Sequence, residues 1–180
     1  MITEATRSTS TLTLDDPPQT VFDVSVVFVP PTTPGGQPVF RFFGLTGPND
    51  AKVLAPEVDF ILTLSINGPG TVVFADPAIT WYPPGDQSQP SPQPDYIINL
   101  VRTDDQVTFS DVNPANSPTM VLVSFVVTVT YTAPTSDGGT VTALYNSHGD
   151  AFVGETFVSH DPTIINADPT GSGNLTPAGA

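Results

Sequence analysis

The segment MVLVSFVVTVTY, from Met120 to Tyr131, says the most about the fold, because apolar residues recur at every second position over its whole length. Its odd-numbered positions are all apolar, whereas its even-numbered positions become polar at Ser124, Thr128 and Thr130. Successive side chains of a β-strand point to opposite faces of a sheet. The segment is therefore predicted to form a long strand with one face buried in a hydrophobic core.

Shorter apolar segments recur along the chain, separated by stretches rich in proline, glycine, asparagine and aspartate. They are Leu12–Leu14, Val21–Val29, Val39–Leu45, Val58–Ile66, Thr71–Ala75, Ala78–Tyr82, Tyr96–Arg102, Gln106–Ser110, Thr140–Tyr145, Ala151–Val158 and Thr163–Ile165. The turn signal Asn67–Gly70 predicts a hairpin between the strands on either side of it. Asp137, Gly138 and Gly139 predict a tight turn into the strand that begins at Thr140.

These segments predict an all-β chain, because no stretch of about a dozen residues has apolar positions at helical spacing. We expect a single antiparallel β-sandwich of about 8–10 strands. The number of strands and the long connections favour a jelly roll over an immunoglobulin sandwich, and the Cys…Trp…Cys spacing of antibody domains is absent. The predicted organisation is a flexible arm at residues 1–10, a sandwich domain at 11–167 and a polar tail at 168–180.

The composition supports one domain and excludes several kinds of site. The 180 residues are 38% hydrophobic, which is enough for one core. Cysteine is absent, which excludes a disulfide framework, a zinc–thiolate cluster and a thiol nucleophile. The N-terminal residues lack the apolar stretch of a signal peptide, and no apolar run approaches the ~20 residues of a membrane-spanning helix. We therefore expect no signal peptide, no transmembrane segment and synthesis in a cytoplasm.

The chain is strongly acidic. Eighteen acids stand against four bases, which gives a net charge of -14. The four bases are Arg7, Arg41, Lys52 and Arg102. Nucleic-acid binding depends on basic side chains that neutralise phosphates, so no nucleic-acid partner is expected. The acidity is consistent either with an ordinary acidic protein or with one that works in high salt, where counterions screen the repulsion between acids.

The two histidines, His148 and His160, lie on either side of the predicted strand Ala151–Val158. Acids near them are Asp150, Glu155 and Asp161. An eight-residue strand would hold its ends on the order of 26 Å apart. We therefore interpret the histidines as residues of surface turns and not as ligands of a shared metal ion.

Other polar groups offer weaker signals. Oxygen atoms of Asp104, Asp105, Asp111 and Asn113 could contribute to a calcium site, although no EF-hand motif is present. Ser172 lies between two glycines but in the polar tail, where nothing would hold a hydrolase nucleophile. The sequence therefore predicts no enzyme, no catalytic, cofactor-binding or metal-binding residues, and no cofactor.

The aromatic pair Trp81–Tyr82 precedes the proline-rich segment Pro83–Asp95. An exposed pair could stack on sugar rings, but a buried Trp81 in the core is the favoured interpretation. The prolines Pro90, Pro92 and Pro94 superficially match a ligand of the PxxP type. The simpler interpretation is a stiff surface connection.

In size, single-sandwich pattern and Asp-rich, Lys-poor composition, the chain resembles the small single jelly-roll major capsid proteins of internal-membrane icosahedral viruses of halophilic archaea. The resemblance depends on the strands Val21–Val29, Val58–Ile66 and Met120–Tyr131 and on the acids between them. It implies a structural protein of the virion that assembles into capsomers with itself and with a second capsid protein, close to an internal viral membrane. The terminal arms would then contact neighbouring subunits.

The alternative is a soluble acidic β-sandwich of a bacterium or archaeon that binds a carbohydrate or calcium. Such a binding module would use Trp81, Tyr82 and the acids of the loops. A loss of glycan or calcium binding on Trp81→Ala would favour it over the capsid interpretation.

Overall fold

The computed structural model describes residues 18–33, 35–45, 50–83, 88–114, 120–148, 151–153, 156–158 and 161–167. These residues form strands and contain no helix, so none of them could cross a membrane as a helix. The predicted arm at 1–10, the strand Leu12–Leu14 and the tail at 168–180 lie outside the described residues.

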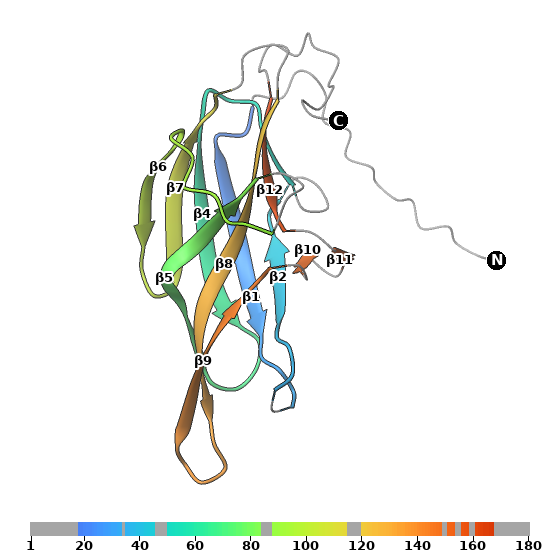
Figure 1. Cartoon of the computed structure of the whole chain (residues 1–180), viewed down its shortest axis with the longest axis vertical. Helices are drawn as coiled ribbons and strands as arrows, with labels where there is room; N and C mark the ends of the chain where they lie inside the picture. The colour runs from blue at the N-terminus through green and yellow to red at the C-terminus, as the bar shows by residue number, and fades with distance from the viewer. Residues whose placement is uncertain are drawn as a thin grey trace, which may run out of the picture.

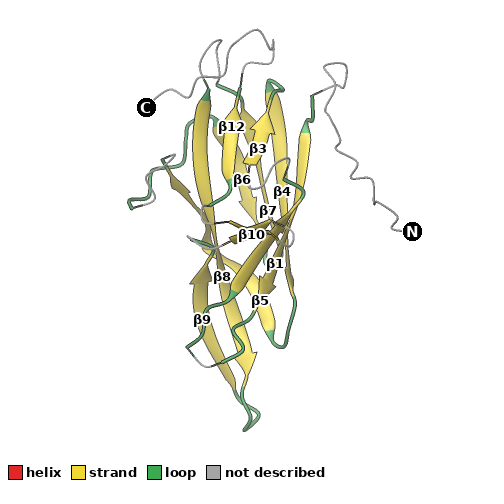
Figure 2. Cartoon of the chain, turned by 90° about the vertical axis from the view of Figure 1, so that its right-hand side faces the viewer, coloured by secondary structure: helices red, strands yellow, loops and turns green. Residues whose placement is uncertain are grey.

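The strands form two sheets that pack face to face (Figures 1 and 2). The first sheet has the order β11-β10-β2-β1-β4-β7-β6, and the second has the order β3-β12-β8-β5, with β9 paired to β8. The strands of the first sheet are β1 (Val21–Val29), β2 (Val39–Phe43), β4 (Glu57–Ile66), β6 (Ile97–Arg102), β7 (Gln106–Val112), β10 (Ala151–Val153) and β11 (Thr156–Val158). Those of the second are β3 (Asp50–Val53), β5 (Thr71–Tyr82), β8 (Val121–Pro134), β9 (Thr140–Asn146) and β12 (Thr163–Asn166).

The core lies between the two sheets, where the alternating positions of the sequence point inward. Strands β1 and β4 bury every second side chain, as their patterns predict. Three rings from neighbouring strands of the first sheet form a stack with Phe60 in the middle. The Phe60 ring centroid lies 4.9 Å from that of Phe22 and 4.9 Å from that of Phe109. Trp81 of the second sheet meets Phe109 edge to face at 5.5 Å. The predicted β-sandwich is confirmed.

The pairing within the sheets is mixed and not wholly antiparallel as we expected. Three of the strand pairs that the structure describes are parallel: β1 with β4, β2 with β10, and β3 with β12. Parallel neighbours need a crossover between them, and the crossover from β1 to β4 runs through β2 and through β3, which lies in the second sheet. Strand β3 was not among the predicted strands. The jelly-roll connectivity stays a prediction.

The predicted hairpin at Asn67–Gly70 is wrong, because β4 and β5 belong to different sheets. The turn carries the chain from one sheet to the other and is hydrogen-bonded to a strand of each sheet. The Asn67 N–H donates to the Phe28 carbonyl at 2.8 Å, and the Tyr131 hydroxyl donates to the Pro69 carbonyl at 2.9 Å. A Cβ on Gly70, whose φ is 93°, would lie 2.5 Å from the Thr132 carbonyl oxygen.

Two further predictions about strand boundaries need correction. Thr71–Ala75 and Ala78–Tyr82 form one strand, β5, whose register with β8 shifts between Phe74 and Ile79. Ala151–Val158 is two strands, because β10 and β11 pair antiparallel with each other. The predicted tight turn at Asp137–Gly139 is confirmed as the turn of the β8–β9 hairpin.

Candidate functional site

His148 and Asp161 meet where the chain leaves β9 and where it enters β12. His148 Nδ1 lies 2.9 Å from Asp161 Oδ2, and the Asp161 side chain is 0% exposed against 35% for His148. The Tyr82 ring stacks on the imidazole with centroids 5.0 Å apart. The backbone N–H of His148 also donates to Asn146 Oδ1 at 3.1 Å. The imidazole is therefore held by a ring on its face and a carboxylate at its edge.

The expected separation of the residues around Ala151–Val158 is wrong, because the chain reverses between β10 and β11. Ala151 pairs with Val158, so both ends of this segment lie side by side. Asp150, Glu155 and His160 lie outside the residues whose side chains are described. A carboxylate on Nδ1 orients a histidine in catalytic and zinc sites alike. Nevertheless, the described part of the chain contains no group of three or more histidines and acids placed to hold a metal ion.

Asp111 and Asn166 form a polar pair between the two sheets, and both are 0% exposed. Asn166 Nδ2 donates to Asp111 Oδ2 at 3.0 Å, but Asp111 Oδ1 and Asn166 Oδ1 have no hydrogen-bond partner among the described residues. Burial raises the pKa of Asp111 to about 6, although the hydrogen bond from Asn166 lowers it. Burial and the charge of Asp111 together raise the pKa of Tyr96 to about 12.

The proposed calcium ligands are not brought together. Asp104 and Asp105 are exposed in the turn between β6 and β7. Asp111 and Asn113 lie at the opposite end of β7, about 20 Å away along the strand. Asn113 Nδ2 lies 3.1 Å from the Ala167 carbonyl oxygen and donates to it.

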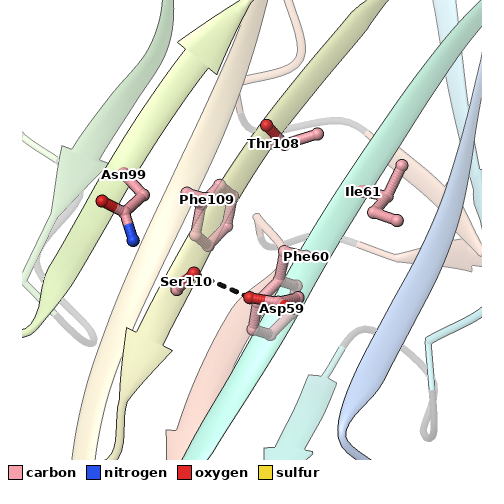
Figure 3. A pocket seen from close by; sticks show the side chains of 7 residues that line it. All are labelled: Asp59, Phe60, Ile61, Asn99, Thr108, Phe109 and Ser110. Carbon is pink, nitrogen blue, oxygen red and sulfur yellow. Dashed lines mark hydrogen bonds between the residues drawn. The ribbon is translucent and has the colours of Figure 1, made fainter.

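A shallow hollow of about 270 Å³ lies over strands β4, β6 and β7 (Figure 3). Asn99 has a φ of 56°, and the register of β6 against β7 shifts between Ile98 and Val101. Asn99 lies within this bulge and is one of the residues that line the hollow. Polar groups of Asp59, Asn99, Thr108 and Ser110 line the hollow, and the Ser110 hydroxyl donates to Asp59 Oδ1 at 2.7 Å. No pattern in the sequence indicated this hollow, because it depends on the bulge.

The aromatic pair divides between the core and the surface. Trp81 is 4% exposed and packs against Phe109 and Phe125, which confirms the interpretation as a core residue. Tyr82 is half-buried and lies against His148. In the proline-rich segment, Ser91 forms a bridge with Trp81, and its N–H donates to the Trp81 carbonyl at 2.8 Å. The segment therefore covers part of the edge of β5.

Exposed apolar side chains gather on two strands. Among the described residues, seven large apolar side chains are exposed, and four of them lie on β6 and β9. These four are Leu100, Val101, Val141 and Leu144. Strand β6 ends the first sheet, and β9 pairs only with β8 in the described part of the chain. Apolar side chains therefore concentrate on strands at the edges of the sheets.

A scan of protein-family models finds no match, and a search of curated proteins finds no similar protein.

Proposed function

We propose that the protein is a structural subunit of a shell, a capsid protein that assembles with copies of itself and with a second capsid protein. The observation that carries the proposal is the exposure of apolar side chains on β9, whose outer edge has no partner strand in the described part of the chain. Val141 and Leu144 on β9 are 58% and 68% exposed. Apolar side chains gathered on an open edge are typical of surfaces that contact other chains.

The packing of the core supports a role as a rigid building block. The stack of Phe22, Phe60 and Phe109 joins three adjacent strands of one sheet, and Trp81 links this stack to the other sheet. Aromatic pairs of this geometry add to the stability that burial alone provides. A subunit that is repeated many times in a shell benefits from one fixed shape.

The charge supports the environment that the resemblance implies. A net charge of -14 makes copies repel one another in dilute buffer. In salt near 1 M the Debye length falls to about 3 Å, so copies can approach. We therefore propose that assembly occurs in high salt, in the virion of a halophilic archaeal virus with a membrane inside its shell.

Electron microscopy and sedimentation of the purified full chain test this function, at low and at multimolar salt. Co-expression with the products of neighbouring genes tests for the second capsid protein. We expect oligomers or particles at high salt and a stable complex with one small β-rich neighbour. A protein that stays monomeric at high concentration in both salts, and that recruits no such neighbour, would refute the proposal.

The hollow in Figure 3 favours a second candidate function, the binding of a small polar ligand such as a sugar. Its carboxylate, hydroxyl and amide groups offer both donors and acceptors. A glycan array and a calcium titration test this function, with Asp59→Ala as the site variant and the exposed Asp95→Ala as its control. Binding that is lost only on Asp59→Ala would support it. No binding by the unmodified protein would exclude these two ligand classes.

A further inference from the structure

We propose that β9 pairs antiparallel with β9 of a second copy, so that two second sheets join into one across a two-fold axis. This inference rests on the proposed role as a shell subunit and names its contact. Strand β9 runs from Thr140 to Asn146 and forms an unbroken ladder of seven residue pairs with β8. Its other edge has no partner among the described residues. A strand paired on one side directs alternate backbone N–H and C=O groups outward.

The edge of β9 lacks the features that usually block strand addition. The segment TVTALYN has no charged residue, no proline and no bulge in its register. Charged side chains, prolines and bulges are the common means by which proteins protect an open edge. Val141 and Leu144 are exposed and lie on opposite faces of the strand, so an added strand would cover apolar surface on both faces.

Two other edges are obstructed. Strand β5 receives the Arg102 guanidinium on its Phe74 carbonyl at 3.1 Å and the bridge from Ser91 at Trp81. Strand β6 is bulged next to Asn99, which interrupts its ladder with β7. By comparison, β9 offers about 24 Å of regular strand.

The hairpin that presents β9 is held in shape by its turn. The Thr135 N–H donates to the Gly139 carbonyl at 2.9 Å, and the Gly138 N–H donates to the Thr135 carbonyl at 3.1 Å. The Asp137 carboxylate accepts from the Thr135 hydroxyl and from the Gly139 N–H. These hydrogen bonds lower the pKa of Asp137. The hairpin tip extends beyond the other strands at the lower end of Figures 1 and 2, so a second copy can reach it.

The net charge of the chain favours a second copy of the protein as the partner of the free β9 edge. Each copy carries -14, so contact between copies is least costly where neither surface bears an acid. The free strand β9 meets that condition along its whole length. An identical strand is self-complementary in an antiparallel two-fold arrangement. Full overlap places Ala143 opposite Ala143 of the second copy, Val141 opposite Tyr145, and Thr142 opposite Leu144.

The contact is smaller than a standard interface of about 1,600 Å², so one pair of strands alone should associate weakly. In a shell, many such contacts act together and the avidity rises. The association should strengthen with salt, because the charges outside the contact repel. A basic partner protein would show the opposite dependence on salt.

Sedimentation of the full chain at 0.01 M and 1 M NaCl tests the contact with two matched variants. Leu144→Asp adds an acid on β9 and Val101→Asp adds one on β6, at exposed fractions of 68% and 59%. In the paired arrangement the two carboxylates that Leu144→Asp introduces, one from each copy, would lie on one face about 7–8 Å apart. We expect Leu144→Asp to weaken association on the order of tenfold and Val101→Asp to change it less than about twofold. Circular dichroism checks that both variants keep the fold.

Cysteine cross-linking gives an independent test, because the chain has no native cysteine. Cβ atoms of directly opposed residues lie about 4.5–5.5 Å apart, which oxidation or a short bis-maleimide can bridge. We expect Ala143→Cys to form covalent dimers at 1 M NaCl and the control Val101→Cys to remain monomeric.

The outcomes separate this inference from the proposed function. Assemblies that form equally with both Asp variants, without cross-linking through Ala143→Cys, overturn the β9 contact but leave a shell subunit. Association through β9 that stops at a dimer supports the contact and overturns the shell. Association that weakens with salt, or that occurs only with another protein, overturns the second copy as occupant. A monomer under every condition overturns both proposals.

Discussion

Replacing Asp111 with asparagine should stabilise the protein at neutral pH. The Asp111 carboxyl is buried between the sheets, and no described residue donates a hydrogen bond to its Oδ1 atom. The Oδ1 atom of Asn166 also lacks a donor in this part of the chain. A buried carboxylate in this state bears a desolvation cost that its one hydrogen bond does not offset. An asparagine amide removes the charge and supplies N–H donors to a pair that now has two acceptors unsatisfied.

The size of the stabilisation expected from Asp111→Asn follows from the pKa of Asp111, which burial raises from 3.8 to about 6. Because the folded state binds this proton more tightly than the unfolded state, the protonated carboxyl favours folding below pH 3.8. That contribution is lost progressively as the pH rises through about 6. The difference corresponds to roughly 3 kcal/mol at ~1.4 kcal/mol for each pH unit. The stabilisation by Asp111→Asn should therefore grow from near zero at pH 4 to about this value at pH 7.

Urea unfolding of the unmodified protein and of Asp111→Asn, at several values from pH 4 to pH 8, measures this difference. The other acids occur in both proteins, so their contributions cancel in the comparison. Asp95→Asn makes the same change of charge at an exposed side chain and should alter the free energy of unfolding by less than about 0.5 kcal/mol. A difference for Asp111→Asn that is flat across this range, or a loss of stability at pH 7, would refute the reasoning.

Three further substitutions test the packing by chemical denaturation. Gly44→Ala should cost at least about 2 kcal/mol, because φ is 93° and the new Cβ would lie 2.1 Å from the Asp23 carbonyl oxygen; a neutral effect would contradict the close approach. Phe60→Ala removes the middle ring of the three-ring stack and should cost about 3–5 kcal/mol; a loss below ~1 kcal/mol would mean that the stack adds little. Tyr131→Phe breaks the hydrogen bond to Pro69 and should cost about 1 kcal/mol; unchanged stability would show that water replaces the bond.

Most strands were predictable because alternation is a local property of the sequence. The predictions for β1, β4 and β8 agree with the structure within a few residues. Pairing is not local, which explains the wrong hairpin at Asn67–Gly70. That turn signal fixes a reversal of the chain but not the sheet that the next strand enters. The division of Ala151–Val158 into two strands could not be predicted for a similar reason. A short apolar segment has the same sequence pattern whether it forms one strand or two.

The buried polar pair had a signal in the sequence that was not used. Asp111 continues the inward positions of Val107 and Phe109, and Asn166 continues that of Ile164. A polar residue in register with core residues predicts a buried polar group. Its partner could not be predicted, because the two residues are 55 positions apart and belong to different sheets. The contact between His148 and Asp161 could not be predicted, because the sequence did not indicate that the chain reverses between β10 and β11.

The positions of the strands show which edges of the sheets bear acids and which do not. From the composition alone, the acids account for solubility or tolerance of salt. In the structure they also limit how copies can meet, because an edge that bears acids repels its own copy. Strand β9 is exposed, regular and free of charge in a chain with eighteen acids. The charge therefore supports the proposed β9 contact, because any edge that bears acids is a less favourable place for two copies to meet.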